Sequence, residues 1–348
     1  MSTERPDSCV LFRTDSVLDD AERRPPAVVI GLPRSGSTFL AHVITTLNEW
    51  YVFDDLYFVQ TADSVRANGP LTPTQVNKLT DFLGWSLKAR IRHEDKFLRP
   101  DCSWDDADKM VEAVRTLYAA RAVEWPELQE EWITRLALHH GRTRWGWKTP
   151  QDFHHVRRLQ EVYPGVRFIF ILRDPARMMA SFKFISGRDG KQGQYHPILY
   201  SRYWRMAVEA YKRYENDDSV PMLLVRFEEL TKEPDAQADR IAGFLGASRS
   251  GPVPVKGSNT SFTKGGRRDI TPTEQWMLRR MAGPLMDELG YTVPDARFRL
   301  RDLPDLALTT LRFVRYQART LPRHARKRTQ VVSFLKAWWR SPDSQQAS

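Results

Sequence analysis

The sequence is poor in cysteine, with two, Cys9 and Cys102, in 348 residues. Domains that depend on disulfides need several pairs, so that class of protein is excluded, and two cysteines alone cannot form a zinc site. Long apolar runs are also missing. No stretch reaches the roughly 18 uninterrupted apolar residues of a membrane-spanning helix, and the N-terminus lacks the apolar centre of a signal peptide. We therefore expect a cytoplasmic globular protein.

Acidic residues are absent between residues 306 and 340, where nine lysines and arginines occur. The net charge of the chain is +10, so the rest of the sequence is close to neutral. Because the excess charge is confined to one terminal segment, we do not expect nucleic-acid binding. The segment also contains Trp338 and Trp339, and basic helices with aromatic residues often lie on anionic membranes. Two roles for the segment 306–340 therefore remain open: it makes peripheral contact with the inner face of the membrane, or it packs on the body of the protein.

Short apolar runs alternate with amphipathic segments along much of the sequence. Residues 27–30 and 166–172 are rich in β-branched and aromatic residues and predict buried strands, and residues 144–148 and 222–227 predict shorter ones. Strands that alternate with helices indicate an α/β fold with a parallel, doubly wound sheet. Ligands bind such sheets at the carboxyl ends of the strands. The helices predicted near these strands cover residues 37–47, 151–163 and 199–215.

The segment Gly31–Thr38, GLPRSGST, resembles the P-loop pattern G-x-x-x-x-G-K-[ST], but Ser37 replaces the lysine. Glycines let backbone N–H groups approach an oxyanion, and the following helix N-terminus adds positive potential. Arg34 supplies a cation from inside the loop. An ordinary strand-to-helix turn is the alternative to a phosphate site. The residues predicted to bind phosphate are Arg34, Ser35, Gly36, Ser37 and Thr38.

The motif PRSGST after an apolar strand resembles the 5′-phosphosulfate loop of the PAPS-dependent sulfotransferases, in particular their bacterial and tyrosylprotein-like branches. That family carries lysine or arginine at the position of Arg34 and hydroxyl residues after the glycine. Its cytosolic members then have a tryptophan that stacks on adenine. Phe39 occupies this position here, so stacking on adenine and packing in the core both stay open. The resemblance implies transfer of a sulfuryl group from 3′-phosphoadenosine 5′-phosphosulfate (PAPS) to a hydroxyl. The sequence contains no metal-ligand cluster of convincing spacing, and lysine and arginine can stabilise the developing charge, so we expect no metal ion.

A second resemblance concerns an arginine and a serine after a buried strand. In the sulfotransferases this pair, eight residues apart, holds the 3′-phosphate of the donor. Arg173 directly follows the strand predicted at 166–172, and Ser181 lies eight residues later. Arginine suits phosphate because its planar guanidinium makes paired, charge-assisted hydrogen bonds. A surface turn at Arg173 and a helical position for Ser181 are the alternatives.

Two weaker similarities to the same family concern a loop and a cation. Ser261 and Lys264 lie in the polar, basic segment 255–268, which resembles the C-terminal loop that closes over the donor; a solvated loop explains it equally well. Lys148, in GWKTP, resembles a K-[DTS]-P element of related sulfotransferases. With Arg34 it is our candidate for stabilising charge on the leaving oxygen. A solvated lysine at a strand end is the alternative.

The general base is expected about twenty residues after the loop, where tyrosylprotein-type members have a glutamate. That distance from Arg34 reaches Asp54 and Asp55, which are flanked by apolar residues. A carboxylate in such a setting can serve as a base, and we prefer Asp55 over Asp54. His93 and His140 remain alternative bases. A solvated turn or helix cap is the alternative role for the two aspartates.

The resemblance covers residues 27–185 clearly and is fainter to about residue 270. We predict a polar, partly disordered N-terminal lead-in at 1–26, a sulfotransferase domain at 27–300 and a basic, helical C-terminal extension at 301–348. A helical insertion at about 60–140 could shape an acceptor pocket. The fold class we predict is α/β, with a P-loop-like doubly wound parallel sheet flanked by helices.

Two other functions fit parts of the pattern. A P-loop kinase or other nucleotide phosphotransferase would share the loop, but the missing lysine and the pair Arg173 and Ser181 argue against it. A catalytically silent, membrane-associated nucleotide-binding protein would keep the fold without transfer. For a sulfotransferase, the acceptor is expected to be a carbohydrate, a lipid-linked molecule or another small metabolite with a hydroxyl group.

Overall fold

The chain divides into two compact units in the computed structural model. Unit 1 comprises Met1–Asp174 and Met206–Lys256, and unit 2 comprises Pro175–Arg205 and Gly257–Ser348. Among the described residues, no helix has the length and apolar character needed to span a membrane. The structure describes residues 10–20, 24–92, 100–119, 121–184, 191–249, 251–254 and 268–320.

Unit 1 contains a parallel five-stranded sheet with the strand order β2-β3-β1-β4-β5. All residues of β1 and β2 are buried, as expected for strands covered on both faces. The parallel sheet with flanking helices confirms the predicted fold class. The sequence did not predict β2, a short run that ends in an acidic residue. The strands are β1 (Ala27–Gly31), β2 (Trp50–Asp54), β3 (Arg144–Lys148), β4 (Arg167–Leu172) and β5 (Met222–Arg226).

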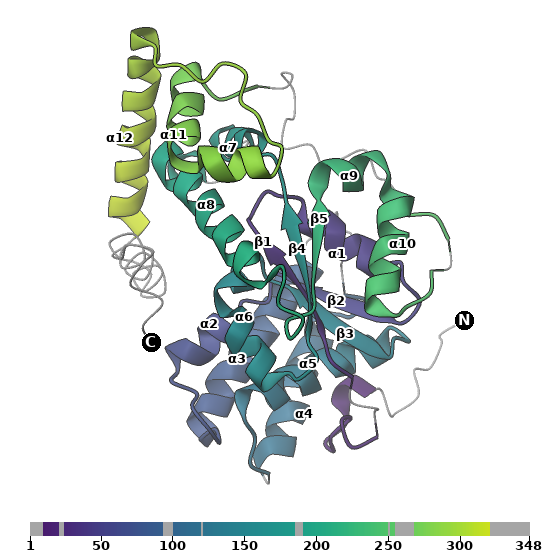
Figure 1. Ribbon diagram of the computed structural model, residues 1–348. Helices are drawn as coiled ribbons and strands as arrows, with labels where there is room; N and C mark the ends of the chain where they lie inside the picture. Colours follow the sequence, from purple (N-terminus) through teal and green to yellow (C-terminus); the bar gives the residue numbers. More distant parts are fainter. Residues whose placement is uncertain are drawn as a thin grey trace, which may run out of the picture. The chain divides into compact units, whose positions relative to one another are not determined.

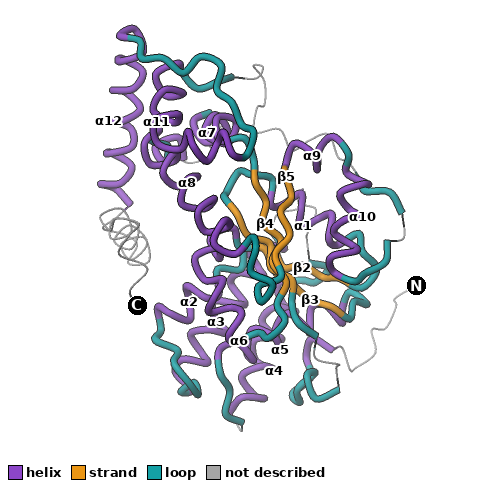
Figure 2. The backbone as a smooth tube through the Cα atoms, in the orientation of Figure 1, coloured by secondary structure: helices purple, strands orange, loops and turns teal. Residues whose placement is uncertain are grey.

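Helices cover both faces of this sheet (Figures 1 and 2). Helices α1 and α10 bury apolar side chains against Val29 and Ile169 on one face. On the other face, Trp147 contacts the ring of Tyr163 with centroids 5.7 Å apart. The helices of unit 1 are α1 (Ser37–Thr45), α2 (Phe58–Ser64), α3 (Pro73–Ile91), α4 (Trp104–Ala119), α5 (Trp125–His139), α6 (Val156–Val162), α9 (Phe227–Lys232) and α10 (Pro234–Leu245), with 3₁₀ helices η1 (Val10–Phe12) and η2 (Pro150–His155).

The predicted helical insertion corresponds to α2–α5. Helix α3 begins with a capping box, in which Thr72 and Gln75 each bond the backbone N–H of the other. The single helix predicted over 151–163 is instead divided into η2 and α6. Pro150 opens η2, consistent with the preference of proline for the first helical turn.

Part of the predicted polar lead-in, residues 10–20, packs into unit 1. Leu11 is buried, and the carboxylate of Glu131 accepts a hydrogen bond of 2.7 Å from the Ser16 hydroxyl. Glu131 also pairs at 2.7 Å with Arg135, and neither side chain is exposed. Apolar residues such as Leu11 explain why this stretch folds onto the helices, although its overall composition is polar.

Unit 2 is helical in its described part. The side chain of Glu274 in α11 accepts hydrogen bonds from Lys183 at 2.8 Å and from the Tyr195 hydroxyl at 3.1 Å. Helix α8 (Pro197–Tyr214) begins in unit 2 and ends in unit 1. The other elements of unit 2 are α7 (Pro175–Lys183), η3 (Lys191–Gln194), α11 (Pro272–Glu288), η4 (Leu300–Asp302) and α12 (Leu303–Thr320).

Candidate active site

The predicted site residues of unit 1 gather at the carboxyl edge of the sheet. The glycine loop follows β1, Asp54 ends β2, Lys148 ends β3, and Arg173 follows β4. Strand β1 lies between β3 and β4, and the register pairs Asp54 directly with Lys148. Because all strands are parallel, these residues share the edge at which ligands bind such sheets.

Two glycines shape the loop after β1. Gly31 has φ 139°, and a Cβ there would lie 2.4 Å from the carbonyl oxygen of Ile171. Gly36 has φ 90°, precedes α1, and would place a Cβ 2.1 Å from the ring of Phe227. Since neither position can accept a side chain, the loop lies close against β4 and Phe227. Its backbone leads into the N-terminus of α1, which is suited to an anion.

The loop side chains combine a cation with hydroxyl groups. Ser35 and Ser37 are buried, while Arg34 and Thr38 are half-buried. Burial lowers the pKa of the Arg34 guanidinium. Arg34 also has φ 68°, an uncommon backbone conformation for a residue other than glycine. Phe39 packs half-buried against the core, as in the core-facing alternative, and its stacking on adenine stays a prediction.

Lys148 connects the loop to the two aspartates. Its Nζ lies 3.3 Å from Thr38 Oγ1, 2.7 Å from Asp54 Oδ1 and 2.5 Å from Asp55 Oδ1. The side chain is 3% exposed, so it is not the solvated strand-end lysine of the alternative interpretation. Burial acts to lower the pKa of Lys148, but the charges of Asp55 and Asp54 outweigh it and raise the pKa. The ammonium group therefore stays charged at neutral pH.

The two aspartates differ in access. The side chain of Asp54 is 1% exposed, whereas that of Asp55 is 26% exposed. Arg90 Nη1 lies 3.2 Å from Asp54 Oδ2 and 3.5 Å from Asp55 Oδ2. Asp54 is thus enclosed between two cations, and Asp55 retains a side open to a substrate. The arrangement excludes a solvated turn for Asp54.

Arg90 was missed by sequence analysis. It lies near the end of α3, in the helical insertion, and belongs to no recognisable motif. The only sequence signal was indirect: two carboxylates beside a buried strand need cationic partners. The helical insertion therefore contributes Arg90 to the carboxyl edge of the sheet.

The turn after β2 is held in an uncommon conformation. Asp55 and Tyr57 have φ 51° and 50°, and neither is a glycine. The backbone N–H of Tyr57 donates to Thr149 Oγ1 at 3.1 Å, and the N–H of Thr149 donates to the Val29 carbonyl at 3.2 Å. Strained residues of this kind cluster at functional sites, where the surrounding structure holds them in place. Here the turn carries Asp55 beside Lys148.

A further buried carboxyl supports the same region. Asp152, in η2, accepts hydrogen bonds from Gln60 Nε2 at 2.7 Å and from Trp147 Nε1 at 2.8 Å. It thereby links η2 to α2 and β3. Burial raises the pKa of Asp152 to about 6. Sequence analysis did not identify this residue, because its partners lie on separate elements.

Arg173 contacts the glycine loop directly. Its Nη1 donates to the carbonyl oxygen of Arg34 at 2.8 Å, and its guanidinium lies 4.5 Å from the centre of the Phe227 ring. Phe227 thus lies against both Gly36 and Arg173 and is another residue that sequence analysis missed. Ser181 is buried on α7 and belongs to unit 2, whereas Arg173 belongs to unit 1. Their joint binding of a phosphate stays a prediction.

Three further candidate residues cannot be placed, and His140 lies in a backbone-bonded position. Ser261, Lys264 and His93 lie outside the described residues. His140 Nε2 accepts the backbone N–H of Asp101 at 3.0 Å, and its Nδ1 donates to the Leu136 carbonyl at 2.7 Å. Both ring nitrogens are therefore engaged by backbone, which argues against His140 as the base. Among the described residues, no group of three or more His, Cys, Asp or Glu could hold a metal ion.

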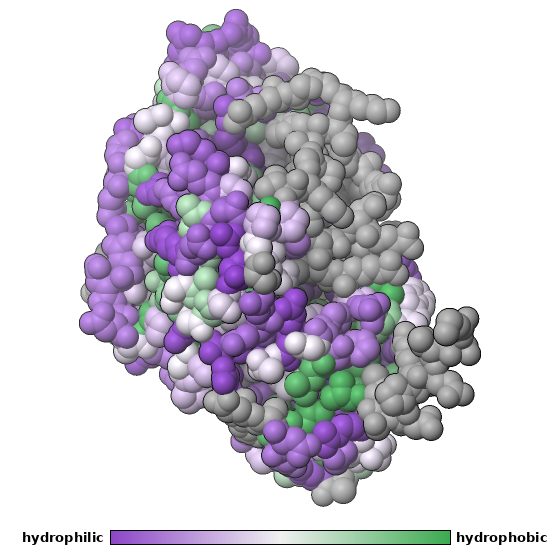
Figure 3. Space-filling model, turned by 90° about the vertical axis from the view of Figure 1, so that its right-hand side faces the viewer, coloured by the Kyte–Doolittle hydropathy of each residue, from purple (hydrophilic) through white to green (hydrophobic). Residues whose placement is uncertain are grey.

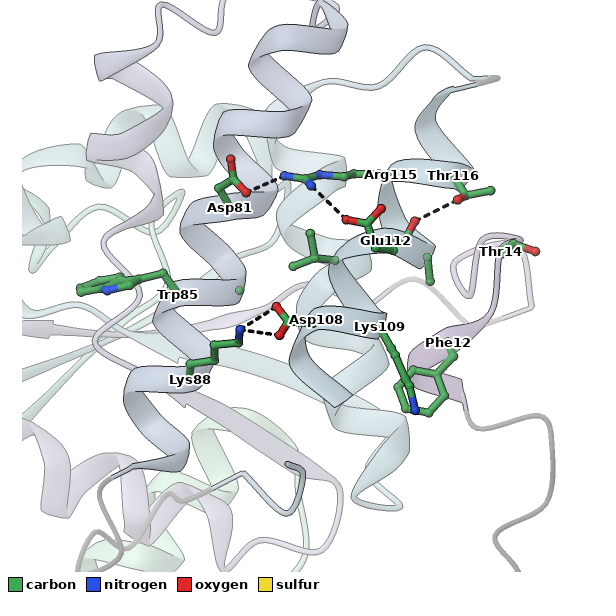
Figure 4. A pocket seen from close by; sticks show the side chains of 13 residues that line it. Phe12, Thr14, Asp81, Trp85, Lys88, Asp108, Lys109, Glu112, Arg115 and Thr116 are labelled. Carbon is green, nitrogen blue, oxygen red and sulfur yellow. Dashed lines mark hydrogen bonds and ion pairs between the residues drawn. The ribbon is translucent and has the colours of Figure 1, made fainter. Parts of the chain in front are cut away.

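A separate pocket of about 790 Å³ lies between α3, α4 and η1 (Figure 4). Two pairs of its charged side chains point toward each other: Lys88 pairs with Asp108, and Arg115 pairs with Asp81, both at 2.6 Å. No strand-end residue of the sheet lines it. Because these charges are already paired, we assign it no role in the chemistry.

Comparisons with known proteins bear on the family of the chain. A family model described as the sulfotransferase family matches residues 25–250, and a search of curated proteins finds no match. The sulfotransferase domain of the Synechococcus PCC 7002 olefin synthase is 16% identical, with 84% of this chain and 100% of that chain covered and a TM-score of 0.51. A sulfotransferase from Alicyclobacillus acidocaldarius is 14% identical, with 80% of this chain and 100% of that chain covered and a TM-score of 0.43. Since the family model spans more than half of the sequence, this chain belongs to the sulfotransferase family.

Proposed function

We propose that this protein transfers the sulfuryl group of PAPS to a hydroxyl group of a glycan, a lipid-linked molecule or another small metabolite. The observation that carries the proposal is the position of Lys148, whose Nζ contacts both Thr38 of the phosphate loop and Asp55. Sulfuryl transfer requires a cation at the leaving oxygen and a base at the attacking hydroxyl, only a few ångströms apart. We assign these two roles to Lys148 and Asp55, which lie within contact distance of each other.

The donor would bind along the loop and the adjoining strand end. The backbone after Gly36, the hydroxyls of Ser37 and Thr38, and the Arg34 guanidinium suit the 5′-phosphosulfate. Arg173 and Ser181 would hold the 3′-phosphate. The hydrogen bond from Arg173 to the Arg34 carbonyl supports this assignment, because it keeps a second guanidinium beside the loop.

In the transfer step, the acceptor oxygen attacks the sulfur while the bond between sulfur and the bridging oxygen breaks. Asp55 takes the proton of the acceptor hydroxyl. Negative charge develops on the bridging oxygen, which leaves as part of the 5′-phosphate of 3′-phosphoadenosine 5′-phosphate (PAP). The ammonium of Lys148 stabilises this charge, with Arg34 as the second cation. Asp54 and Arg90 hold Lys148 and Asp55 in place.

The test is a transfer assay with sulfur-labelled PAPS and a panel of hydroxyl acceptors, including cell extracts before and after removal of lipid. Labelled product and a matching amount of PAP are expected. Binding of PAP and of ATP, each with and without Mg²⁺, separates this proposal from a kinase. Tight binding of ATP with no response to PAP would overturn it, and PAP binding without any transfer would favour a silent nucleotide-binding protein.

A further inference from the structure

Helix α12 exposes a stripe of large apolar side chains. Leu308, Leu311 and Val314 are 44%, 56% and 55% exposed. Residues three apart lie on neighbouring positions of a helix surface, so the three side chains form one face. Figure 3 shows a different face of the molecule, on which hydrophilic residues predominate among the coloured atoms and hydrophobic residues gather in a patch near the lower edge. A continuous apolar stripe on a helix indicates an interaction surface.

The opposite face of α12 is anchored within unit 2. Thr309 is buried, and the ring of Phe313 lies 5.4 Å from that of His196. The hydroxyl of Tyr316 accepts a hydrogen bond of 2.6 Å from Gln194 Nε2, in η3. The helix is thus held by its own packing face. The apolar stripe is not needed for this anchoring and is available to a partner.

Three arginines accompany the stripe. Arg312, Arg315 and Arg319 are exposed and follow one another at helical spacing. None of them forms an ion pair with any residue that the structure describes. Acidic residues are absent from 306 to 340, and the sequence after α12 adds six lysines and arginines with Trp338 and Trp339. The partner of this face must therefore offer both negative charge and an apolar layer.

We infer that this face of α12 lies on an anionic lipid surface. The boundary between headgroups and acyl chains takes the leucine and valine side chains, and lipid phosphates attract the arginines. A nucleic acid would match the arginines but would leave Leu311 and Val314 without apolar contact. An enzyme held in this way reaches acceptors that sit at the membrane surface, which would restrict its substrates by location.

The experiment is co-sedimentation of the full chain with vesicles of phosphatidylcholine alone and with vesicles that contain 30% phosphatidylglycerol, a composition of about one anionic lipid in three. Binding is expected on the anionic vesicles at low salt, with little on the neutral ones, and should weaken as salt rises. Equal partition onto both kinds of vesicle, or none onto either, would overturn the inference.

Two triple variants test the stripe and the arginines separately. The first combines Leu308→Gln, Leu311→Gln and Val314→Gln, and the second combines Arg312→Gln, Arg315→Gln and Arg319→Gln. Each arginine at such a surface contributes up to about fivefold, so the second variant should lose up to roughly a hundredfold in partitioning. The first should lose about tenfold or more, since each apolar side chain would no longer enter the lipid. Full binding by both variants would contradict a role for α12.

A matched control comes from another helix. Trp85 on α3 is 65% exposed, so Trp85→Gln removes an exposed apolar side chain outside α12 and should leave vesicle binding unchanged. Melting temperature and PAP binding of all variants show whether the fold and the donor site are intact. Lost vesicle binding with intact PAP binding supports the lipid surface independently of the proposed transfer reaction. A parallel loss with Trp85→Gln would point to nonspecific adsorption and overturn the assignment to α12.

Discussion

Lys148 and Asp55 form an ion pair of 2.5 Å in which the ammonium is enclosed and the carboxylate is partly open. Asp54 and Arg90 close the cluster from the buried side. A cation that cannot move into solvent has a fixed position relative to the phosphate loop. A carboxylate with one open side can receive a proton from a substrate.

Asp55→Asn should lower turnover by about 10²–10⁴, because a positioned base typically contributes that much to the rate. PAP affinity should stay within about twofold of wild type, since Asp55 lies outside the loop. Asp54→Asn is the matched control. It removes the enclosed partner of both Lys148 and Arg90, so it should lower the melting temperature more than Asp55→Asn does. Steady-state transfer kinetics measure the turnover of both variants, and thermal melts measure their stability. Normal turnover of Asp55→Asn would mean that another residue is the base.

Arg173→Ala should weaken PAP binding by about 1.5–3 kcal/mol, the usual contribution of a hydrogen bond to a charged group. Ser181→Ala should cost less, because its hydroxyl is neutral. Titration calorimetry with PAP and with AMP gives the comparison, since AMP lacks the 3′-phosphate. Equal losses for PAP and AMP would mean that Arg173 acts only by supporting the Arg34 carbonyl.

Gly36→Ala should abolish PAP binding, because the new Cβ would meet the Phe227 ring at 2.1 Å and φ is 90°. Gly69→Ala is the control at a similar φ of 75°, with no atom within 4 Å of the added Cβ. Gly69→Ala should lower the free energy of unfolding by only about 1–2 kcal/mol, because alanine disfavours the left-handed conformation, and it should leave PAP binding intact. Wild-type PAP affinity in Gly36→Ala would show that the loop does not need its contact with Phe227.

Asp152→Asn should change how stability depends on pH. The pKa of Asp152 is about 6 in the folded protein and 3.8 ordinarily, so between these values the folded state binds more protons than the unfolded state. The buried charge therefore lowers wild-type stability above pH 6, by about 3 kcal/mol, and this cost is relieved as the pH falls toward 4. Asparagine carries no such charge.

Urea unfolding of wild type and Asp152→Asn at pH 4.5, 5.5 and 7.0 measures this effect, with pH values chosen across the interval between the two pKa values. The stability of wild type relative to the variant should rise as the pH falls. Subtracting the unfolding free energy of the variant from that of wild type removes the contribution of other titrating groups. One such group is His154, where burial lowers the pKa to about 4. A constant difference across the three pH values would contradict a buried carboxyl that titrates in this range.

The parts of the site that lie within short segments could be predicted from the sequence. The loop around Arg34 and the strand before Arg173 are recognisable because a few adjacent residues determine their local structure. The sequence also indicated Lys148 as a site residue, but it did not indicate that this side chain is buried between Asp54 and Asp55. That depends on the pairing of β2 with β3, which joins Asp54 to Lys148 across more than ninety residues of sequence.

Arg90, Asp152 and Phe227 could not be predicted for the same physical reason. Each acts through a partner on another element: Arg90 through Asp54, Asp152 through Trp147, and Phe227 through Gly36. Hydrophobic periodicity indicates which face of an element is buried, but it does not indicate which buried face meets which. Strand β2 was missed because it is short and ends at Asp54, the first of two adjacent aspartates, a residue type that is typical of turns.

The anchoring of residues 10–20 limits where this protein can be shortened for expression. Arg135 donates hydrogen bonds to the carbonyl oxygens of Leu11, Arg13 and Asp15, and Glu131 takes two from Ser16 and Val17. A recombinant version that started at residue 24, just before β1, would leave this buried ion pair without five of its hydrogen-bond partners. Breaking up a buried charge network typically costs about 3–5 kcal/mol, a large part of the stability of a domain. Affinity tags therefore belong ahead of residue 10, and trimming to the first strand of the sheet should yield an insoluble product.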